Sequence, residues 1–366
     1  MTMRLLMTAD AVGGVWQYAT DLADALTPHG VETVLALLGP SPAAAQRARA
    51  EAIPGLTLID TGLPLDWMAE GAAPVARAGE IVAEIAAREA VDLVHLNMPT
   101  LGARVQFPAP VVAVTHGCVG TWWQAARPTP LDPGFAWHRA MMRDGLARAD
   151  FVVAPSAAYG AIVQRYYELR HAPLTVHNGR IAADAAAAAR HDCALTVGRL
   201  WDSVKQAELL DAAAARLAVP FHAAGAVTGP HGEHVSLDHL HLLGELDGAG
   251  IAAALAAQPV FVSAANFEPF GLAVLEAAQA GCALVLSDIG TFRELWDGAA
   301  LFVSDQTPEA YARAVEQVIG NDQQRRALGE AAKARAERYT PAAAAAAMAR
   351  IYRALRAAHP AKREAA

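Results

Sequence analysis

The sequence predicts an α/β protein with two domains, each a parallel sheet flanked by helices. Three observations predict this. The chain has 366 residues, and a single domain usually holds roughly 100–200. Hydrophobic residues make up 54% of the chain, enough for two buried cores. Short apolar runs alternate with longer amphipathic runs along the sequence, which is typical of strand–helix–strand units.

The first domain is expected at residues 1–180. Between its first two strands, Val15–Leu26 has apolar residues at helical spacing, which predicts a helix. The expected strands are Arg4–Thr8, Thr33–Leu37, Leu56–Ile59, Leu93–Leu96, Val111–Val114, Phe151–Ala154 and Leu174–Val176.

The second domain is expected at residues 193–340, where the same alternation restarts. The alanine-rich stretch Arg180–Asp192 is interpreted as the connection between the domains, and a short helix within it stays open. The expected strands are Leu195–Val197, Phe221–Ala223, Leu240–Leu243, Val260–Val262, Leu284–Leu286 and Leu301–Val303.

The tail, residues 341–366, is expected to begin with a helix at Pro341–Ala358. Proline suits the first turn of a helix because its missing N–H has no partner there. One apolar stripe indicates a helix that packs on a domain; its residues are Met348, Ile351, Tyr352 and Leu355.

Charge and composition exclude some partners. The formal net charge is −8, and no cluster of Lys and Arg suggests a nucleic-acid surface. An acidic chain gives no support to strong adhesion to anionic membranes, although a local basic patch, and with it peripheral association, stays open. No stretch of about 20 uncharged apolar residues predicts a membrane span.

The cysteines and the first residues indicate a cytoplasmic setting. The three cysteines, Cys118, Cys193 and Cys282, are odd in number and widely spaced, and they form no zinc or redox motif. The apolar run before Asp10 is too short for the core of a signal peptide, and we interpret it as the first strand.

The most informative segment runs from Phe267 to Glu276. It follows an apolar strand and opens a helix whose first amides, at Phe270, Gly271 and Leu272, are expected to be free to attract phosphate oxygens. Glu268 stands beside this anion site, and Glu276 lies two turns into the helix. Glu268 can accept bonds from sugar hydroxyls and Glu276 from a ribose diol. The plain alternative is an acid near a helix cap and a solvated helix residue.

A second segment places two cations after a strand that ends at Gly198. Arg199 can fork across phosphate oxygens, and Lys205 can add a point charge. When a bond between a sugar and a diphosphate breaks, negative charge builds on the leaving oxygen, and fixed cations lower that barrier. An ordinary surface arginine and lysine would give the same pattern.

Two further loops follow strands in the first half. Gly13 and Gly14 form a strand-to-helix turn suited to a phosphate or a close-lying sugar, but they do not make a dinucleotide fingerprint. His116 stands at the carboxyl end of a strand, where open α/β sheets bind ligands. A tight turn and a polar loop histidine without function are the alternatives.

Together these segments resemble the retaining glycosyltransferases of family 4. The resemblance covers nearly the whole chain in order, and its most specific motif is carried by Glu268 and Glu276, with seven residues between them that include Pro269-Phe270-Gly271. It implies the GT-B fold: two Rossmann-like domains facing a cleft, with the C-terminal helix crossing back to the N-terminal domain. Six residues separate Gly198 from Lys205, one more than the commoner family spacing.

The resemblance also implies roles for single residues. Arg199 and Lys205 would bind the donor diphosphate near Gly198, and Glu268 would contact the donor sugar. Glu276 would bind the ribose, and His116 would touch the sugar at the reaction centre. The remaining donor contacts would come from Gly13, Gly14, Phe270, Gly271 and Leu272, and from Leu243, Gly244 and Leu246 facing the base.

The expected function is transfer of a hexose-type sugar from a UDP- or GDP-sugar to an unknown acceptor, with retention and without cofactor or metal. No Asp-x-Asp motif stands at a strand end to ligate a metal. Two alternatives stay open. One is another sugar-nucleotide enzyme, an epimerase or a phosphorylase; the other is a non-catalytic nucleotide-sugar-binding protein.

Overall fold

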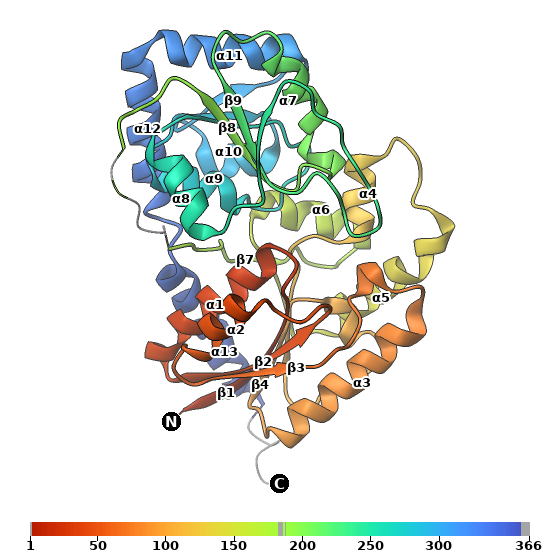
Figure 1. The fold of residues 1–366 in the computed structure, drawn as a ribbon. Helices are drawn as coiled ribbons and strands as arrows, with labels where there is room; N and C mark the ends of the chain where they lie inside the picture. The colour runs from red at the N-terminus through yellow and green to blue at the C-terminus, as the bar shows by residue number, and fades with distance from the viewer. Residues whose placement is uncertain (1, 182–185, 187, 360–366) are drawn as a thin grey trace. The chain divides into compact units, whose positions relative to one another are not determined.

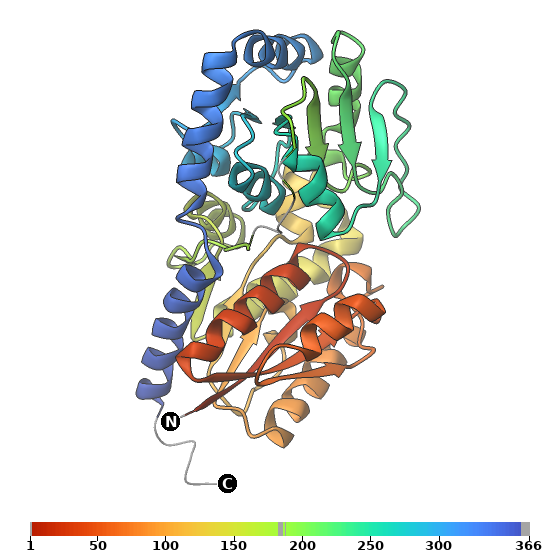
Figure 2. The same cartoon turned by 60° about the vertical axis from the view of Figure 1, so that its left-hand side comes forward.

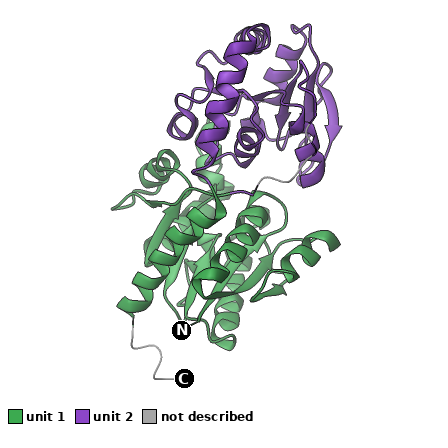
Figure 3. Cartoon of the chain, turned by 90° about the vertical axis from the view of Figure 1, so that its left-hand side faces the viewer, with its two compact units in different colours: residues 1–179, 340–366 green, residues 180–339 purple. Residues whose placement is uncertain are grey.

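The computed structural model describes residues 2–181, 186 and 188–359, and Figure 1 labels many of its helices and strands. The chain divides into two compact units (Figure 3): unit 1 is residues 1–179 with 340–366, and unit 2 is residues 180–339. Part of the expected connection, residues 182–185 and 187, lies outside the described residues, so a helix there is not described.

Unit 1 is built on a parallel sheet with the strand order β3-β2-β1-β4-β5-β6-β7. Successive side chains of β1 point to opposite faces, so Leu5 and Met7 join one core and Leu6 the other. The strands are β1 (Met3–Asp10), β2 (Val31–Leu38), β3 (Leu56–Asp60), β4 (Leu93–Leu96), β5 (Val111–Val114), β6 (Phe151–Ala154) and β7 (Leu174–Thr175).

Helices cover both faces of this sheet (Figure 1). They are α1 (Gly14–Leu26), α2 (Ala44–Glu51), α3 (Ala72–Arg88), α4 (Val119–Ala126), α5 (Ala136–Arg148), α6 (Ala157–Tyr167) and α13 (Pro341–Ala358), with 3-10 turns η1 (Thr27–His29), η2 (Asp66–Met68), η3 (Pro99–Gly102) and η4 (Pro133–Phe135).

Helix α13 returns to unit 1 and lies alongside α1 (Figure 2). Its Met348, Tyr352 and Leu355 are buried in the same core as β1, and each such side chain stabilises the fold by roughly 1.5–3 kcal/mol. The expected helix bounds and the expected crossing back are confirmed. Gly179 allows the crossing, because a Cβ on it would lie 2.1 Å from the carbonyl carbon of Thr340.

Unit 2 has a second parallel sheet, ordered β10-β9-β8-β11-β12-β13. Its strands are β8 (Ala194–Val197), β9 (Phe221–Ala224), β10 (His241–Gly244), β11 (Val260–Ser263), β12 (Leu284–Ser287) and β13 (Leu301–Val303). Every strand expected from the sequence, in both units, is present with its ends shifted by two residues at most.

The helices of unit 2 also pack on both faces of its sheet. Helices α7 and α11 share one core with the sheet, and α9, α10 and α12 share the other. The bounds are α7 (Ala207–Ala214), α8 (Gly248–Ala256), α9 (Leu272–Gln279), α10 (Gly290–Trp296), α11 (Pro308–Gly320) and α12 (Asp322–Ala336), with the 3-10 turn η5 (Ser203–Lys205).

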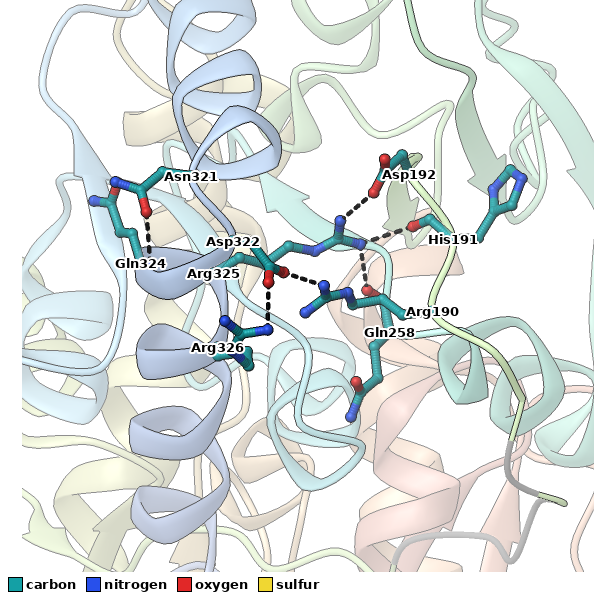
Figure 4. A network of polar contacts seen from close by, with 9 residues as sticks. All are labelled: Arg190, His191, Asp192, Gln258, Asn321, Asp322, Gln324, Arg325 and Arg326. Atoms are coloured by element: carbon teal, nitrogen blue, oxygen red, sulfur yellow. Dashed lines mark hydrogen bonds and ion pairs between the residues drawn. The ribbon is translucent and has the colours of Figure 1, made fainter.

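A polar network fixes the segment that enters β8 (Figure 4). Arg325 of α12 donates to Asp192 Oδ1 at 2.6 Å and to the backbone oxygens of His191 at 2.7 Å and Gln258 at 2.8 Å. Beside it, Asp322 pairs with both Arg190 and Arg326. Because β8 begins at Ala194, this network holds the base of the strand whose far end leads to Gly198.

Candidate active site

In unit 2 four of the expected residues, Gly198, Lys205, Glu268 and Gly271, meet at the point where the strand order reverses. Strands β8 and β11 are neighbours there, and open α/β sheets bind ligands beyond the carboxyl ends of such a pair. Gly198 follows β8 and Glu268 follows β11. Both line one pocket, together with Lys205, Ser263 and Gly271.

Gly198, which lines this pocket, is approached closely by a second loop. Gly225, directly after β9, has φ of +136°, and a Cβ on it would lie 1.7 Å from the carbonyl oxygen of Gly198. Only glycine fits this position. The amide of Gly198 in turn donates to Ala224 O at 3.0 Å, so the end of β8 is held against the end of β9.

Lys205 reaches the pocket through the 3-10 turn η5. The carboxylate of Asp202 accepts from the amide of Val204 at the start of that turn, and Gln206 has φ of +57° at its end. The Lys205 ammonium lies 2.6 Å from Glu268 Oε2. The turn therefore accommodates the longer spacing after Gly198 and still brings the lysine to the carboxylate.

The structure does not bring Arg199 into this pocket. Its side chain is 54% exposed, and Nη2 lies 2.8 Å from the buried carboxylate of Asp202. The guanidinium also lies 5.5 Å from the centroid of the Trp201 ring, within cation–π range. Asp202 and Trp201 hold Arg199 on the surface beside Gly198.

The start of α9 differs from the expectation at one amide. Phe270 N–H is not free; it points to Glu268 Oε1 at 3.5 Å, because the carboxylate folds back over the helix end. The Phe270 ring is buried, 5.7 Å from the Tyr339 ring, so only its backbone faces the site. Among the described residues, no hydrogen-bond acceptor is found for the amides of Gly271 and Leu272.

Gly271 and the ion pair between Lys205 and Glu268 belong to the lining of the pocket. Gly271 caps α9 with φ of +93°, a conformation that suits glycine. The pocket volume is about 20 Å³, roughly the room for one water molecule.

Glu276 is held by an arginine that the sequence patterns did not single out. Arg180 Nε donates to Glu276 Oε1 at 2.6 Å, and the arginine side chain is only 7% exposed. Gln279, on the same helix, donates to the backbone oxygen of Arg180 at 2.7 Å. Glu276 Oε2 has no partner among the described residues and stays available to a ligand.

In unit 1 the polar residues gather at the reversal between β1 and β4. Asn97 follows β4, and its Oδ1 lies 3.0 Å from His95 Nε2 and 2.8 Å from His116 Nε2. The Asn97 side-chain amide donates to Thr8 O on β1 at 2.7 Å. His95 Nδ1 lies 2.6 Å from the hydroxyl of Tyr352 on α13.

Burial keeps both histidines neutral. It lowers the pKa of His116 to about 3, with a further lowering from the nearby His95, and it lowers the pKa of His95 to about 4. The His116 ring lies 4.3 Å from the ring of Tyr18, centroid to centroid. At neutral pH, His116 is an uncharged hydrogen-bonding group.

Gly13 and Gly14 stand at the carboxyl end of β1. Gly13 caps α1, Gly14 is the first residue of the helix, and a Cβ on Gly13 would meet nothing within 4 Å. The expected strand-to-helix turn is therefore present. No packing contact explains the glycine at 13.

Comparison with known proteins agrees with this architecture. Residues 12–179 match the family profile Glycosyltransferase Family 4, and residues 189–335 match Glycosyl transferases group 1. The two matches cover most of both units. The chain belongs to glycosyltransferase family 4.

Solved GT-B structures share the fold of this family 4 member. Sucrose-phosphate synthase from Thermosynechococcus elongatus superposes with a TM-score of 0.77 at 20% identity, over 97% of this chain and 100% of that one. HepE from Anabaena, in complex with UDP-glucose, gives a TM-score of 0.73 at 18% identity, over 96% and 100%.

A curated relative shares sequence over a shorter stretch. Phosphatidyl-myo-inositol mannosyltransferase from Mycolicibacterium smegmatis is 33% identical over 117 residues, 31% of this chain. The match spans 30% of the length of that mannosyltransferase.

The segment expected to face the base lies at the edge of the unit 2 sheet. Leu243, which is 39% exposed, and Gly244 belong to the edge strand β10, and Leu246 follows it. None of the three lines the pocket of Lys205 and Glu268. Gly244 has φ of +70°, so the chain turns directly after the strand.

Three residues of the site were missed by sequence reasoning: Asn97, Arg180 and Gly225. Asn97 follows a strand just as His116 does, so the rule that selected His116 could also have selected Asn97. Arg180 stands 96 positions from Glu276, and Gly225 stands in no motif. No local pattern indicates either contact.

The described part of the chain has neither a membrane-spanning helix nor a cluster of metal ligands. No helix in this part of the chain has both the length and the apolar character to cross a membrane. Nor does it contain a cluster of three or more His, Cys, Asp or Glu side chains that could hold a metal ion.

Proposed function

We propose that the chain is a retaining, metal-independent glycosyltransferase that moves a hexose-type sugar from a UDP- or GDP-sugar to an acceptor in glycan or glycolipid synthesis. One observation carries the proposal: Gly198, Lys205, Glu268 and Gly271 line one pocket at the strand reversal of unit 2. The complexes of HepE with UDP and with UDP-glucose support a nucleotide-sugar donor, since that protein has the same fold.

The donor diphosphate binds where Lys205 meets the start of α9. Its oxygens replace Glu268 as the partner of the Lys205 ammonium, and they accept from the amides of Gly271 and Leu272. Helix dipoles and free amides favour anions at this position. Arg199, exposed beside Gly198, turns from Asp202 to add a second cation.

Glu268 and Glu276 then bind the sugar and the ribose of the donor, respectively. Once Lys205 binds phosphate, Glu268 is released to accept bonds from sugar hydroxyls. Glu276 keeps Arg180 on Oε1 and offers Oε2 to the ribose diol. Leu243, Gly244 and Leu246 face the base, and Gly13 and Gly14 allow close approach of the donor to the start of α1.

The bond between the anomeric carbon and the diphosphate oxygen breaks, and its electron pair stays on that oxygen. Lys205, Arg199 and the α9 amides stabilise the charge that develops there. The acceptor hydroxyl bonds to the anomeric carbon on the same face and passes its proton to the departing diphosphate. His116 contacts the sugar at this centre. The configuration of the sugar is retained.

Donor binding is tested by titration calorimetry with UDP, GDP and their glucose and mannose conjugates. Lys205→Met removes a charge-assisted bond worth about 1.5–3 kcal/mol, so affinity for the diphosphates should fall roughly 10- to 100-fold. Lys333→Met is the matched control, since Lys333 is an exposed lysine of the same unit. The proposal fails if none of these nucleotides binds, or if both variants bind as the wild type does.

Product analysis separates transfer from the alternatives. A new glycoside with the donor's anomeric configuration, formed equally well in excess chelator, is expected with a suitable acceptor. Epimerised sugar nucleotide, or sugar phosphate formed from free phosphate, would instead indicate an epimerase or a phosphorylase. Tight donor binding without turnover over a broad panel of acceptors would indicate a sensor.

A further inference from the structure

The hydrogen bonds of Asn97 fix which atom faces the two histidines. Its side-chain nitrogen lies 2.7 Å from Thr8 O, a backbone carbonyl that can only accept. The atom that lies near both imidazole rings is therefore the oxygen Oδ1. The backbone amide of Asn97 also donates to Thr8 Oγ1 at 2.9 Å, so the residue is held at two points on β1.

An oxygen between two imidazole nitrogens determines both tautomers. Oδ1 is an acceptor, so His95 Nε2 and His116 Nε2 must each carry a proton to donate to it. A neutral imidazole has one N–H, which leaves Nδ1 of each ring as an acceptor. At His95 that acceptor is used, since Tyr352 O–H lies 2.6 Å from Nδ1 and donates to it.

His116 Nδ1 has no such partner. Among the described residues no hydrogen bond to this atom is found, and the His116 side chain is only partly buried. The ring is held on one side by Tyr18 at 4.3 Å and on another by Asn97. The unused acceptor is thus fixed in direction and remains open to a ligand.

We propose that Asn97 is a positioning residue that holds His116 in its Nε2–H tautomer, so that His116 Nδ1 accepts a hydrogen bond from a hydroxyl group of the substrate. The proposal deepens the proposed function and rests on it for the identity of the ligand as a sugar. It assigns His116 the role of a neutral acceptor, not of a proton donor to the leaving group.

This arrangement selects the chemistry of the ligand group. Nδ1 with a lone pair binds O–H or N–H donors and rejects a carboxylate, a phosphate or a carbonyl oxygen. In a hexose, whose hydrogen-bond donors are hydroxyls, the group that meets His116 is therefore a free hydroxyl. A sugar in which that hydroxyl is replaced by fluorine or a methoxy group loses the bond, whereas a sugar changed at a position away from His116 does not.

Tyr352 completes the network from the C-terminal helix. Its hydroxyl keeps its proton because burial raises the pKa of Tyr352 well above its usual value, and it donates that proton to the unprotonated Nδ1 of His95. That donation stabilises the Nε2–H form of His95, which occupies the second lone pair of Asn97 Oδ1. Helix α13 is thereby connected to His116 through the side chains of His95, on β4, and Asn97, in the loop after it.

The tautomers are measured directly by long-range 1H–15N NMR on ligand-free protein labelled at histidine, with His116→Gln and His95→Gln to assign the two rings. Both rings should give the neutral Nε2–H pattern at pH 7. Asn97→Asp keeps an oxygen acceptor and should preserve the pattern at His116, whereas Asn97→Leu should lose it. The proposal is overturned if wild-type His116 is in the Nδ1–H form or is doubly protonated.

A matched control distinguishes the effect of the hydrogen-bond network on the tautomers from the general effect of removing a buried hydroxyl. Tyr167→Phe removes a buried hydroxyl that lies 3.0 Å from Cys118 Sγ in the loop of His116, but that hydroxyl touches neither histidine. It should leave both tautomers unchanged, while Tyr352→Phe should alter that of His95. Equal effects of the two substitutions would contradict the network.

Turnover supplies a second, independent outcome. Asn97→Leu should lower kcat about 10-fold, the loss of one hydrogen bond in the transition state, and leave the Kd for the nucleoside diphosphate unchanged, since Asn97 lies outside unit 2. Asn97→Asp should restore most of the rate. If no nucleotide binds to the wild type, the proposed function fails while the NMR result still decides the tautomer; unchanged kcat in Asn97→Leu would refute the positioning role.

Discussion

Arg325 offers a sharp test of how the entry to β8 is held. Its side chain is 4% exposed, and its guanidinium satisfies two backbone oxygens and one carboxylate. Gln258, one of the two backbone partners, has φ of +45°, a conformation that costs about 1 kcal/mol for a residue with a side chain. The guanidinium stabilises this turn as well as the segment before the strand.

The cost of Arg325→Met follows from these contacts. A hydrogen bond to a charged group contributes about 1.5–3 kcal/mol, and two backbone oxygens lose theirs. Asp192 is 67% exposed, so the loss of its ion pair with Arg325 adds little to the cost. Arg325 Nε is buried without a partner, and removing this donor offsets about 1 kcal/mol. The expected destabilisation is about 3 kcal/mol, or roughly 6–12 °C in the Tm of unit 2.

The next residue on the same helix is a matched control. Arg326 is 57% exposed, and Asp322 is its one ion-pair partner among the described residues, so Arg326→Met should cost at most about 1 kcal/mol. Urea unfolding of both variants, followed by tryptophan fluorescence, gives the comparison. If the two substitutions destabilise the protein equally, the network of Figure 4 does not hold the start of β8.

Three further outcomes follow from the geometry. Gly225→Ala should destabilise unit 2 by more than about 4 kcal/mol in urea unfolding, because the new Cβ would lie 1.7 Å from the carbonyl oxygen of Gly198. Gly198→Ala should cost about 1 kcal/mol, because its Cβ would have no contact nearer than 4.0 Å; a larger cost for Gly198→Ala than for Gly225→Ala would contradict the packing. Lowering the pH from about 6.5 to about 4 should destabilise the fold, because burial lowers the pKa of His116 and of His95 and the unfolded chain therefore binds protons first. His116→Gln should reduce this dependence of the free energy of unfolding on pH, and an unchanged dependence would contradict the neutral state of His116 in the fold. Glu276→Gln should weaken nucleotide binding about 10-fold by calorimetry, whereas Arg180→Met should change it less and mainly lower stability; equal losses of affinity would place Arg180 in the binding machinery.

Much of the fold could be predicted because its signals are local. Each strand is a short apolar run, and burial of both faces of a parallel sheet requires such runs. Helix α13 begins at Pro341, where the proline suits a first turn. Helix α9 follows Gly271, whose φ of +93° permits the turn before it. These features depend on neighbouring residues, so they are visible in the sequence.

The contacts within the site depend on residues far apart in the chain, and these could not be predicted. The spacing between Gly198 and Lys205 is one residue longer than the commoner family spacing, and η5 brings Lys205 to Glu268, 63 positions later. Arg199, next to Gly198, is instead held outside the pocket by Asp202. Which cation enters a pocket depends on turns and partners that motif spacing does not describe.

In the proposed donor complex, a diphosphate replaces Glu268 as the partner of Lys205 at the start of α9. A crystal structure of the chain with UDP or GDP tests it most directly. We predict phosphate oxygens within hydrogen-bond distance of Lys205 Nζ and of the amides of Gly271 and Leu272, with Lys205 moved off the carboxylate that it now meets at 2.6 Å. A nucleotide bound elsewhere, with that ion pair intact, would contradict the account.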